Sequence, residues 1–206
     1  MRESAVRRAV IVLCAGGHAR VVIDAILQTK MRILGIVDID PELTGKTILG
    51  LPVLGGEDIL SGHIPGKVLL ANGLGGLKSM VPRMQLFERF KASGYDFLTV
   101  RHPSCVLGMD VILSEGVQVM AGAVIQTGAR IGDNSIINTR ASVDHDCMIG
   151  KHVHIAPGAT LCGNVHVGDN AYIGSGATVI PGISIGKGVL IRSGSVITEN
   201  IADSTL

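Results

Sequence analysis

The stretch VDHDCMIG, residues 143–150, belongs to a repeat that decides the fold. From Val143, every sixth position in both directions carries Leu, Ile or Val, as far as Leu107 and Ile197. A second series, four residues after each of these aliphatic residues, is mostly small, as at Ala123, Ala129, Ala141 and Cys147. A six-residue period fits neither an α-helix nor a coiled coil. It predicts a parallel β-helix, in which three short faces make a coil of about 18 residues.

The composition agrees with such a core and excludes several classes of protein. Of the 206 residues, 47% are apolar, only 2% are aromatic, and 28 are glycine. The formal net charge of +1 removes the basic footprint of a nucleic-acid-binding protein. No apolar run approaches the length of a membrane span. Four cysteines without CxxC spacing predict reduced thiols in a cytoplasmic protein rather than a zinc site or disulfides.

The first hundred residues carry a different pattern. Residues 9–13 and 33–37 are predicted strands, joined by a glycine turn at 14–19 and a helix over 20–29. The apolar run at 9–15 is at the short limit for a secretion signal, and Gly16-Gly17-His18 and Arg20 follow it at once, so we interpret it as a buried strand. A glycine turn at a helix start can bind phosphate on backbone N–H groups, although the full GxGxxG pattern is absent. We therefore expect an α/β, Rossmann-like βαβ domain over residues 1–101, followed by the β-helix over residues 102–206.

Chemistry is expected at one corner of the β-helix. His145 lies between Asp144 and Asp146, and a nearby carboxylate raises the basicity of an imidazole and fixes its orientation. His145 is therefore a candidate general base. An 18-residue coil places Gly163 directly over His145, with an open space above the imidazole and an N–H that could donate to an oxyanion. The residues alone leave open the alternative of a solvated surface histidine beside two surface aspartates.

Several short motifs are similar to those of one enzyme family. The C-terminal half contributes Asn138-Thr139, residues 143–147, Ile149-Gly150, His154, Gly158-Ala159 and residues 163–165. The N-terminal half contributes Gly16-Gly17-His18, Asp38, Asn72-Gly73 and His102-Pro103. Over nearly its whole length the chain resembles the hexapeptide-repeat bacterial sugar O- and N-acetyltransferases. That family includes sialic acid O-acetyltransferases and nucleotide-linked 4-amino-sugar N-acetyltransferases, and its β-helices are left-handed.

The resemblance implies roles for individual residues. His145 matches the base that deprotonates the attacking amine or hydroxyl, and Asp146 matches its acidic partner. Contacts to acetyl-CoA are implied for His154, Gly163, Ser175 and Ser193. Contacts to the nucleotide sugar are implied for Gly16, Gly17, His18, Asp38, Gly73 and Asn138, with the glycine turn holding the diphosphate. Relatives are homotrimers whose active sites lie between subunits, which suits an outward-facing His145.

A metal site has little support from histidine spacing. The spacings of 7, 2 and 12 residues along His145, His152, His154 and His166 do not match the three-histidine pattern of the γ-class carbonic anhydrases, which share this β-helix. We therefore expect no metal. His152 and His166 are interpreted as surface residues, and Cys147, in the small inward series, as core filler.

Two departures from the family pattern affect the expected nucleotide and coenzyme contacts. Cys14 stands where relatives often carry glycine, so the nucleotide loop is expected to differ slightly. The chain given ends at Leu206, soon after Ile197, whereas many relatives continue with a short tail over the coenzyme. The mode of adenine binding is therefore left open.

Together these features predict an acetyl-CoA-dependent N-acetyltransferase of surface-glycan (lipopolysaccharide O-antigen) biosynthesis. Its acceptor would be the 4-amino group of a nucleotide-linked 4-amino-4,6-dideoxy sugar. One alternative is O-acetylation of sialic acid or a related sugar. Another, of a different class, is a non-catalytic trimeric scaffold or nucleotide-sugar-binding protein. The choice among UDP, dTDP and GDP cannot be derived from the spacing of these motifs.

Overall fold

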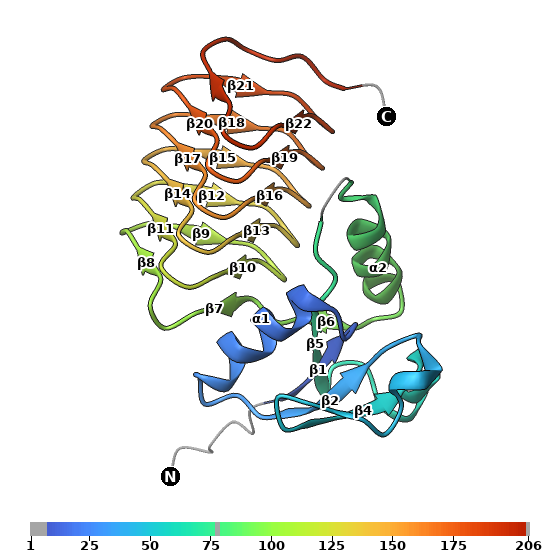
Figure 1. Ribbon diagram of the computed structural model, residues 1–206. Helices are drawn as coiled ribbons and strands as arrows, with labels where there is room; N and C mark the ends of the chain where they lie inside the picture. The colour runs from blue at the N-terminus through green and yellow to red at the C-terminus, as the bar shows by residue number, and fades with distance from the viewer. Residues whose placement is uncertain (1–7, 77–78, 205–206) are drawn as a thin grey trace.

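The protein consists of a small α/β unit at the N-terminus and a stack of β-helical coils at the C-terminus (Figure 1). The structure is a computed structural model that describes residues 8–76 and 79–204. The predicted combination of a Rossmann-like unit and a hexapeptide-repeat β-helix is confirmed. The first strand that stacks in the β-helix is β7, at Val100–Arg101.

The N-terminal unit is built on a six-stranded sheet with the order β3-β4-β2-β1-β5-β6. All neighbouring strands are parallel except β3 and β4. Their bounds are β1 Ala9–Leu13, β2 Ile33–Val37, β3 Thr47–Ile48, β4 Leu51–Gly55, β5 Val68–Asn72 and β6 Asp96–Phe97. The first two expected strands therefore appear with the expected bounds, because each is a short apolar run between turn residues.

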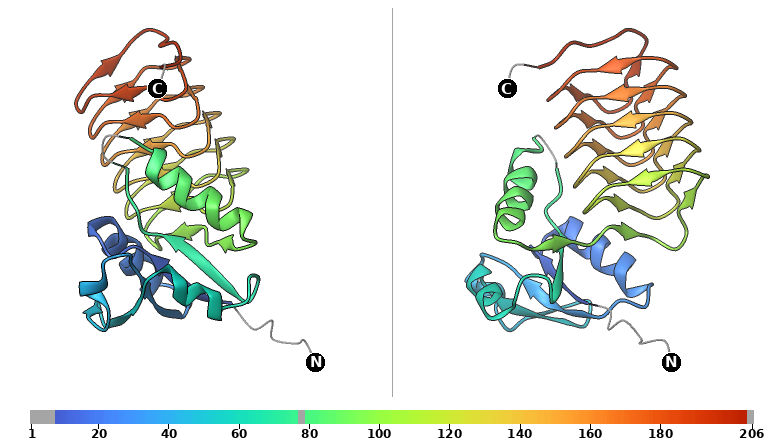
Figure 2. Two further views of the ribbon diagram at one scale, coloured as in Figure 1. Left: turned by 90° about the vertical axis from the view of Figure 1, so that its right-hand side faces the viewer. Right: turned by 180° about the vertical axis from the view of Figure 1, so that it is seen from behind.

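Within the described residues, two α-helices pack against this sheet. Helix α1, Gly17–Leu27, begins three residues before the expected start and buries Val22, Ile23 and Ile26. The hydrophobic cluster that contains the buried face of α1 also includes residues at the start of the β-helix. Helix α1 therefore lies between the sheet and the base of the stack (Figure 2). Helix α2, Val81–Ala92, runs beside the coils. Two short 3₁₀ helices, η1 Pro41–Leu43 and η2 Glu57–Gly62, complete the unit.

The β-helix has three faces, each a parallel sheet of two-residue strands. The first face contains β7, β10 Gln118–Val119, β13 Ile136–Ile137, β16 His154–Ile155, β19 Tyr172–Ile173 and β22 Leu190–Ile191. The second contains β8 Val106–Leu107, β11 Val124–Ile125, β14 Ser142–Val143, β17 Thr160–Leu161, β20 Thr178–Val179 and β23 Val196–Ile197. The third contains β9 Ile112–Leu113, β12 Arg130–Ile131, β15 Met148–Ile149, β18 His166–Val167 and β21 Ser184–Ile185.

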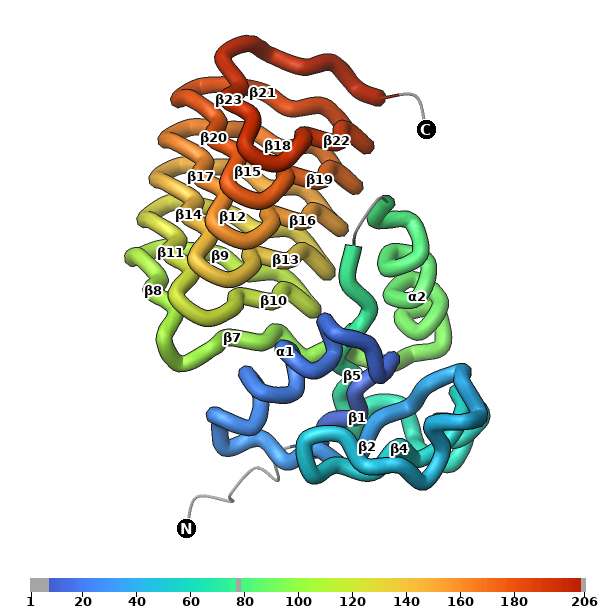
Figure 3. The backbone as a smooth tube through the Cα atoms, in the orientation of Figure 1, coloured from blue at the N-terminus to red at the C-terminus, as the bar shows by residue number. Residues whose placement is uncertain are grey.

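The hexapeptide series explains how the coils close and stack (Figure 3). The aliphatic residue is the second residue of each strand and fills the interior, together with the small series. Every sixth residue from Asp110 to Gly194 adopts φ between 55° and 77°, which turns the chain at each corner. Glycine adopts this backbone conformation at no steric cost, and Asn and Asp tolerate it better than most residues. The 18-residue coil is confirmed by the pairing of Ile137 with Ile155.

Candidate active site

A cavity of about 770 Å³ lies between the N-terminal unit and the β-helix. It is bounded by the carboxyl ends of the first parallel strands, the start of α1 and one edge of the β-helix. Ligands bind at the carboxyl ends of parallel strands in open α/β sheets. The cavity brings together many of the residues implied by the resemblance: Gly16, Gly17, His18, Asp38, Gly73, Asn138, His154 and Ser175.

The start of α1 presents open backbone to this cavity. Gly16 is the N-cap residue, Gly17 is the first helical residue, and no side chain caps the helix. A Cβ atom on either glycine would meet nothing within 4 Å, so the fold itself does not require glycine at these positions. Gly73 differs, because its Cβ would lie 2.4 Å from the carbonyl oxygen of Leu13. The open backbone at the first two glycines leaves room for an anionic group to approach the helix start.

The loop that follows β1 is held by Asp38, which comes directly after β2. Its Oδ2 accepts a hydrogen bond from the N–H of Ala15 at 2.7 Å, and its Oδ1 accepts one from Asp40 at 2.8 Å. Cys14 adopts φ of 69°, a conformation that favours glycine, which explains why glycine would suit this position. Burial raises the pKa of the Cys14 thiol to about 11, with Asp38 adding to the shift. The thiol is therefore protonated and unreactive at neutral pH.

Two imidazoles lie on the cavity wall, with ring centroids 6.4 Å apart. In His18, on α1, Nε2 lies 2.8 Å from Oε1 of Gln118. In His154, on β16, Nδ1 lies 3.0 Å from the carbonyl oxygen of Gly76, and Nε2 lies 3.0 Å from Nδ2 of Asn138. Burial lowers the pKa of His18 to about 4 and that of His154 to about 3, so both rings are neutral at physiological pH.

The orientation of Asn138 determines the tautomer of His154. The N–H of Thr139 donates to Oδ1 of Asn138 at 2.8 Å, which directs the Asn138 amide nitrogen to His154. His154 therefore accepts at Nε2 and donates from Nδ1 to Gly76. The resemblance implies a coenzyme contact for His154, but both of its ring nitrogens form hydrogen bonds within the protein. Sequence reasoning missed Tyr172, which lies one coil above and packs edge-on against His154 at 5.1 Å.

His145 occupies the corner between the second and third faces, between β14 and β15. Its Nδ1 donates to Oδ2 of Asp146 at 2.9 Å, and its N–H donates to Asp144 at 2.8 Å. The side chain is 55% exposed, which leaves Nε2 available to a reacting group. The hydrogen bond to Asp146 raises the pKa of His145, and both aspartates add to the shift by their charge. This is the geometry of an oriented general base.

Gly163 lies against the His145 ring, as the 18-residue coil predicts. A Cβ atom on Gly163 would lie 2.4 Å from Nε2 and 2.6 Å from Cε1 of His145. The imidazole itself therefore fills the space that was expected to remain open above it. Among the described residues, the backbone N–H of Gly163 has no acceptor.

The predicted site residues lie at two separate edges of one chain. His145, Asp146 and Gly163 lie at the corner after the second face, and none of them lines the cavity. The cavity opens at the first face and at the corner that follows it, where Ser175 lies. Ser193 stacks one coil above Ser175, whose carbonyl oxygen accepts from Gly194 at 2.9 Å. His145 and the cavity are thus separated by the second face of the β-helix.

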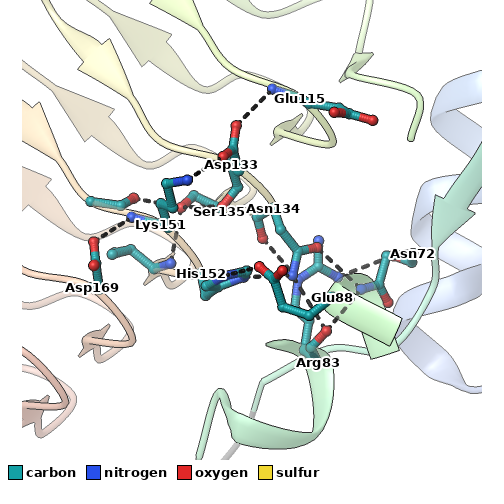
Figure 4. A network of polar contacts seen from close by, with 12 residues as sticks. Asn72, Arg83, Glu88, Glu115, Asp133, Asn134, Ser135, Lys151, His152 and Asp169 are labelled. Carbon is teal, nitrogen blue, oxygen red and sulfur yellow. Dashed lines mark hydrogen bonds and ion pairs between the residues drawn. The ribbon is translucent and has the colours of Figure 1, made fainter. Parts of the chain in front are cut away.

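A network of polar contacts around Arg83 joins α2 to the β-helix (Figure 4). Fully buried Arg83 donates from Nε to Asn134 O at 3.0 Å and from Nη1 to Asn72 O at 3.0 Å and Leu74 O at 2.6 Å. Burial lowers the pKa of Arg83 to about 9. Its carbonyl partners include two residues of the segment 72–76, so the network positions the segment that forms one cavity wall.

The surface interpretation of His152 is wrong. The residue is 5% exposed, contacts Phe87 edge-on at 5.7 Å, and lies 3.0 Å from Asn134 and 3.1 Å from Glu88. Helix α2 covers this corner, and a six-residue repeat contains no information on which corners another unit covers. His166 is exposed as expected, and Cys147 is fully buried in the core.

Two further structural properties concern metals and membranes. Within residues 8–76 and 79–204, no group of three His, Cys, Asp or Glu side chains is arranged to hold a metal ion. In the same part of the chain, no helix combines the length and the apolar character needed to cross a membrane.

Comparison with known proteins assigns both halves of the chain to families. Residues 9–89 match the PglD N-terminal domain, and residues 128–163 and 164–199 match the bacterial transferase hexapeptide (six repeats). The chain is 31% identical over 146 residues to GDP-perosamine N-acetyltransferase of Escherichia coli O157:H7. That match covers 68% of this chain and spans only 63% of the relative's length.

Two solved structures match over almost the full chain. PerB from Caulobacter crescentus, in complex with CoA and GDP-perosamine, is 37% identical with a TM-score of 0.86, covering 96% of this chain and 92% of that one. The acetyltransferase domain of PglB from Neisseria gonorrhoeae, in complex with acetyl coenzyme A, is 34% identical with a TM-score of 0.86, covering 95% and 93%.

The fold and the two-part site define a hexapeptide-repeat acyltransferase with a PglD-type N-terminal domain. More particularly, the chain belongs to the family of acetyl-CoA-dependent sugar N-acetyltransferases. Its relatives favour N-acetyl transfer over the O-acetyl transfer and the scaffold role that the sequence left open.

Proposed function

We propose that this protein transfers the acetyl group of acetyl-CoA to the 4-amino group of a nucleotide-linked 4-amino-4,6-dideoxy sugar. The observation that carries the proposal is the Asp146–His145 pair against Gly163, combined with a cavity at an open helix start. Matches with relatives that act on GDP-perosamine support an amino sugar as the acceptor.

The reaction needs one base and no covalent enzyme intermediate. The sugar amine attacks the thioester carbonyl, forming a C–N bond, while Nε2 of His145 takes a proton from the amine. The tetrahedral intermediate then collapses, the C–S bond breaks, and the proton passes to the sulfur so that CoA leaves as the thiol. Asp146 stabilises the imidazolium that forms in between. The N–H of Gly163 is our candidate donor to the oxyanion.

The cavity has a polar group for each part of the acceptor. The N–H groups at the start of α1 suit the diphosphate. Asp38, at the end of β2, suits a ribose hydroxyl, in the way acidic residues do in dinucleotide-binding folds. The sugar would then extend toward Asn138 and His154 on the β-helix, and we keep Gly73 as a contact to the nucleotide. Ser175 and Ser193, stacked on adjacent coils, remain our candidates for the pantetheine path.

A complete site requires more than one chain. His145 and the cavity lie at different edges of the β-helix, so we propose a homotrimer in which one subunit supplies the cavity and its neighbour supplies the base. Closed cyclic symmetry repeats such a heterologous interface three times. Because nucleotide sugars and acetyl-CoA are cytoplasmic metabolites, we place the reaction in the cytoplasm, in the synthesis of a surface glycan.

The test is thiol release from acetyl-CoA with a panel of UDP-, dTDP- and GDP-linked 4-amino-4,6-dideoxy sugars, with free sialic acid alongside. We expect release with one amino sugar and its loss in His145→Ala. The matched control is His166→Ala, an exposed histidine on β18 that should retain full activity. The proposal would be refuted if thiol were released with sialic acid alone, or if no acceptor in the panel gave release.

A further inference from the structure

The hydrogen-bonding state of His18 is fixed by a buried amide. Gln118, on β10, is fully buried, and its Nε2 donates to the carbonyl oxygen of Asn72 at 2.7 Å. The other end of that amide, Oε1, therefore faces Nε2 of His18 at 2.8 Å. An amide oxygen can only accept a hydrogen bond. Nε2 of His18 thus carries the ring proton and donates it to Gln118.

The second ring nitrogen of His18 is an acceptor only. Nδ1 has no hydrogen-bond partner within residues 8–76 and 79–204, and the residue lines the cavity. Burial and the nearby charge of Arg83 lower the pKa of His18 to about 4, so the ring does not gain a second proton at neutral pH. His154 differs, because both of its nitrogens are engaged by the protein. Of the two cavity imidazoles, His18 alone offers a nitrogen to a ligand.

This lone pair does not suit the diphosphate. Ionised phosphate oxygens carry no hydrogen and accept hydrogen bonds only, so an acceptor nitrogen repels them. The backbone N–H groups of the same helix turn serve the phosphates instead. In the proposed binding mode Asp38 contacts the ribose. The sugar would then lie against His18 and His154. The matching chemistry is a neutral donor on the sugar ring, which means a hydroxyl group.

We propose that the side chain of His18 determines specificity by accepting a hydrogen bond at Nδ1 from a hydroxyl group of the nucleotide-linked sugar, and that its imidazole is not a diphosphate ligand. This inference rests on the proposed function and identifies how its acceptor is recognised. A site built to accept from a hydroxyl discriminates against an analogue without it, because the buried acceptor is then left unpaired. The hydrogen bond to Gln118 fixes the ring of His18, which lines the cavity.

The experiment compares wild type with His18→Ala, using GDP-perosamine, its 2-deoxy and 3-deoxy analogues, and GDP alone. Calorimetry gives the Kd values, and thiol release gives kcat and KM. For His18→Ala we expect about 10-fold weaker binding of GDP-perosamine, with unchanged Kd for GDP and unchanged KM for acetyl-CoA. One deoxy analogue should show the same loss on the wild type and no further loss on the variant.

A second variant separates this role from a purely structural one. His18→Asn places an amide near the position of Nδ1 but cannot reach Gln118, so it should retain most of the affinity for GDP-perosamine. The proposal would be overturned if His18→Ala weakened the binding of GDP and of GDP-perosamine equally. It would also be overturned if His18→Ala discriminated against both deoxy analogues as strongly as the wild type does. The Kd comparison does not need turnover. It therefore decides the role of His18 even if the wild type releases no thiol with any sugar, the result that refutes the proposed function.

Discussion

A Cβ atom on Gly163 would lie 2.4 Å from Nε2 of His145, so the position of the imidazole depends on a glycine in the next coil. Real side chains do not approach this closely, and the ring would have to move. Gly163 does not adopt positive φ, so its backbone conformation is open to any residue. The absence of a side chain there serves the imidazole and not the turn.

We therefore expect Gly163→Ala to abolish most activity without unfolding the protein. Displacing the ring from its hydrogen bond with Asp146 should lower kcat by about 100-fold, which is the contribution typical of a positioned base. Thermal unfolding of the variant should stay within a few degrees of the wild type. The matched control is Gly62→Ala, because a Cβ there meets nothing within 4 Å and φ is again not positive. Full activity in Gly163→Ala would show that the ring position is not critical.

The pH dependence of the reaction should depend on Asp146. His145 works as a base only when neutral, so activity rises with pH through its pKa, which Asp146 raises above the ordinary value of about 6.5. In Asp146→Asn the pKa falls, and the acid limb of kcat/KM moves to lower pH while the maximal rate drops because the base is weaker. The pKa of the sugar amine is common to both proteins and cancels in the comparison. An acid limb that stays in place would exclude His145 as its source.

The repeat made much of the fold predictable, because burial inside a β-helix imposes one aliphatic residue every six positions. The 18-residue coil then placed Gly163 against His145 without further information. The repeat could not predict which faces and corners of the coils are covered by other elements of the chain. His152 and Gln118 lie at positions of the repeat where a side chain can face either solvent or another unit, and both are buried by elements distant in sequence. Tyr172 was missed for the same reason.

Arg83 should be important for both stability and substrate binding. Arg83→Met would leave buried carbonyl oxygens of Leu74 and Asn134 without their donor, and each such loss costs about 1–3 kcal/mol. We expect the free energy of unfolding in urea to fall by about 3 kcal/mol and the KM for the nucleotide sugar to rise, because segment 72–76 lines the cavity. The KM for acetyl-CoA should change less.

A control for that prediction is available on the same helix. Arg89 forms an exposed ion pair with Glu57, and such pairs contribute less than about 1 kcal/mol. Arg89→Met should therefore have little effect on unfolding or on the KM for the nucleotide sugar. Similar losses in the two variants would mean that the carbonyl contacts of Arg83 do not hold the cavity wall.

The division of the site between subunits can be tested with hybrid trimers. In Gly17→Asp the added Cβ atom meets nothing within 4 Å. We therefore expect the fold to tolerate the change, while the new negative charge repels the diphosphate from the helix start. Neither this variant nor His145→Ala should be active alone. If each site combines the cavity of one chain with the base of the next, random co-assembly in equal amounts makes one interface in four intact. Mixed trimers should then show about 25% of wild-type thiol release. If one chain supplied both parts, every site would carry a defect and the mixture would stay inactive.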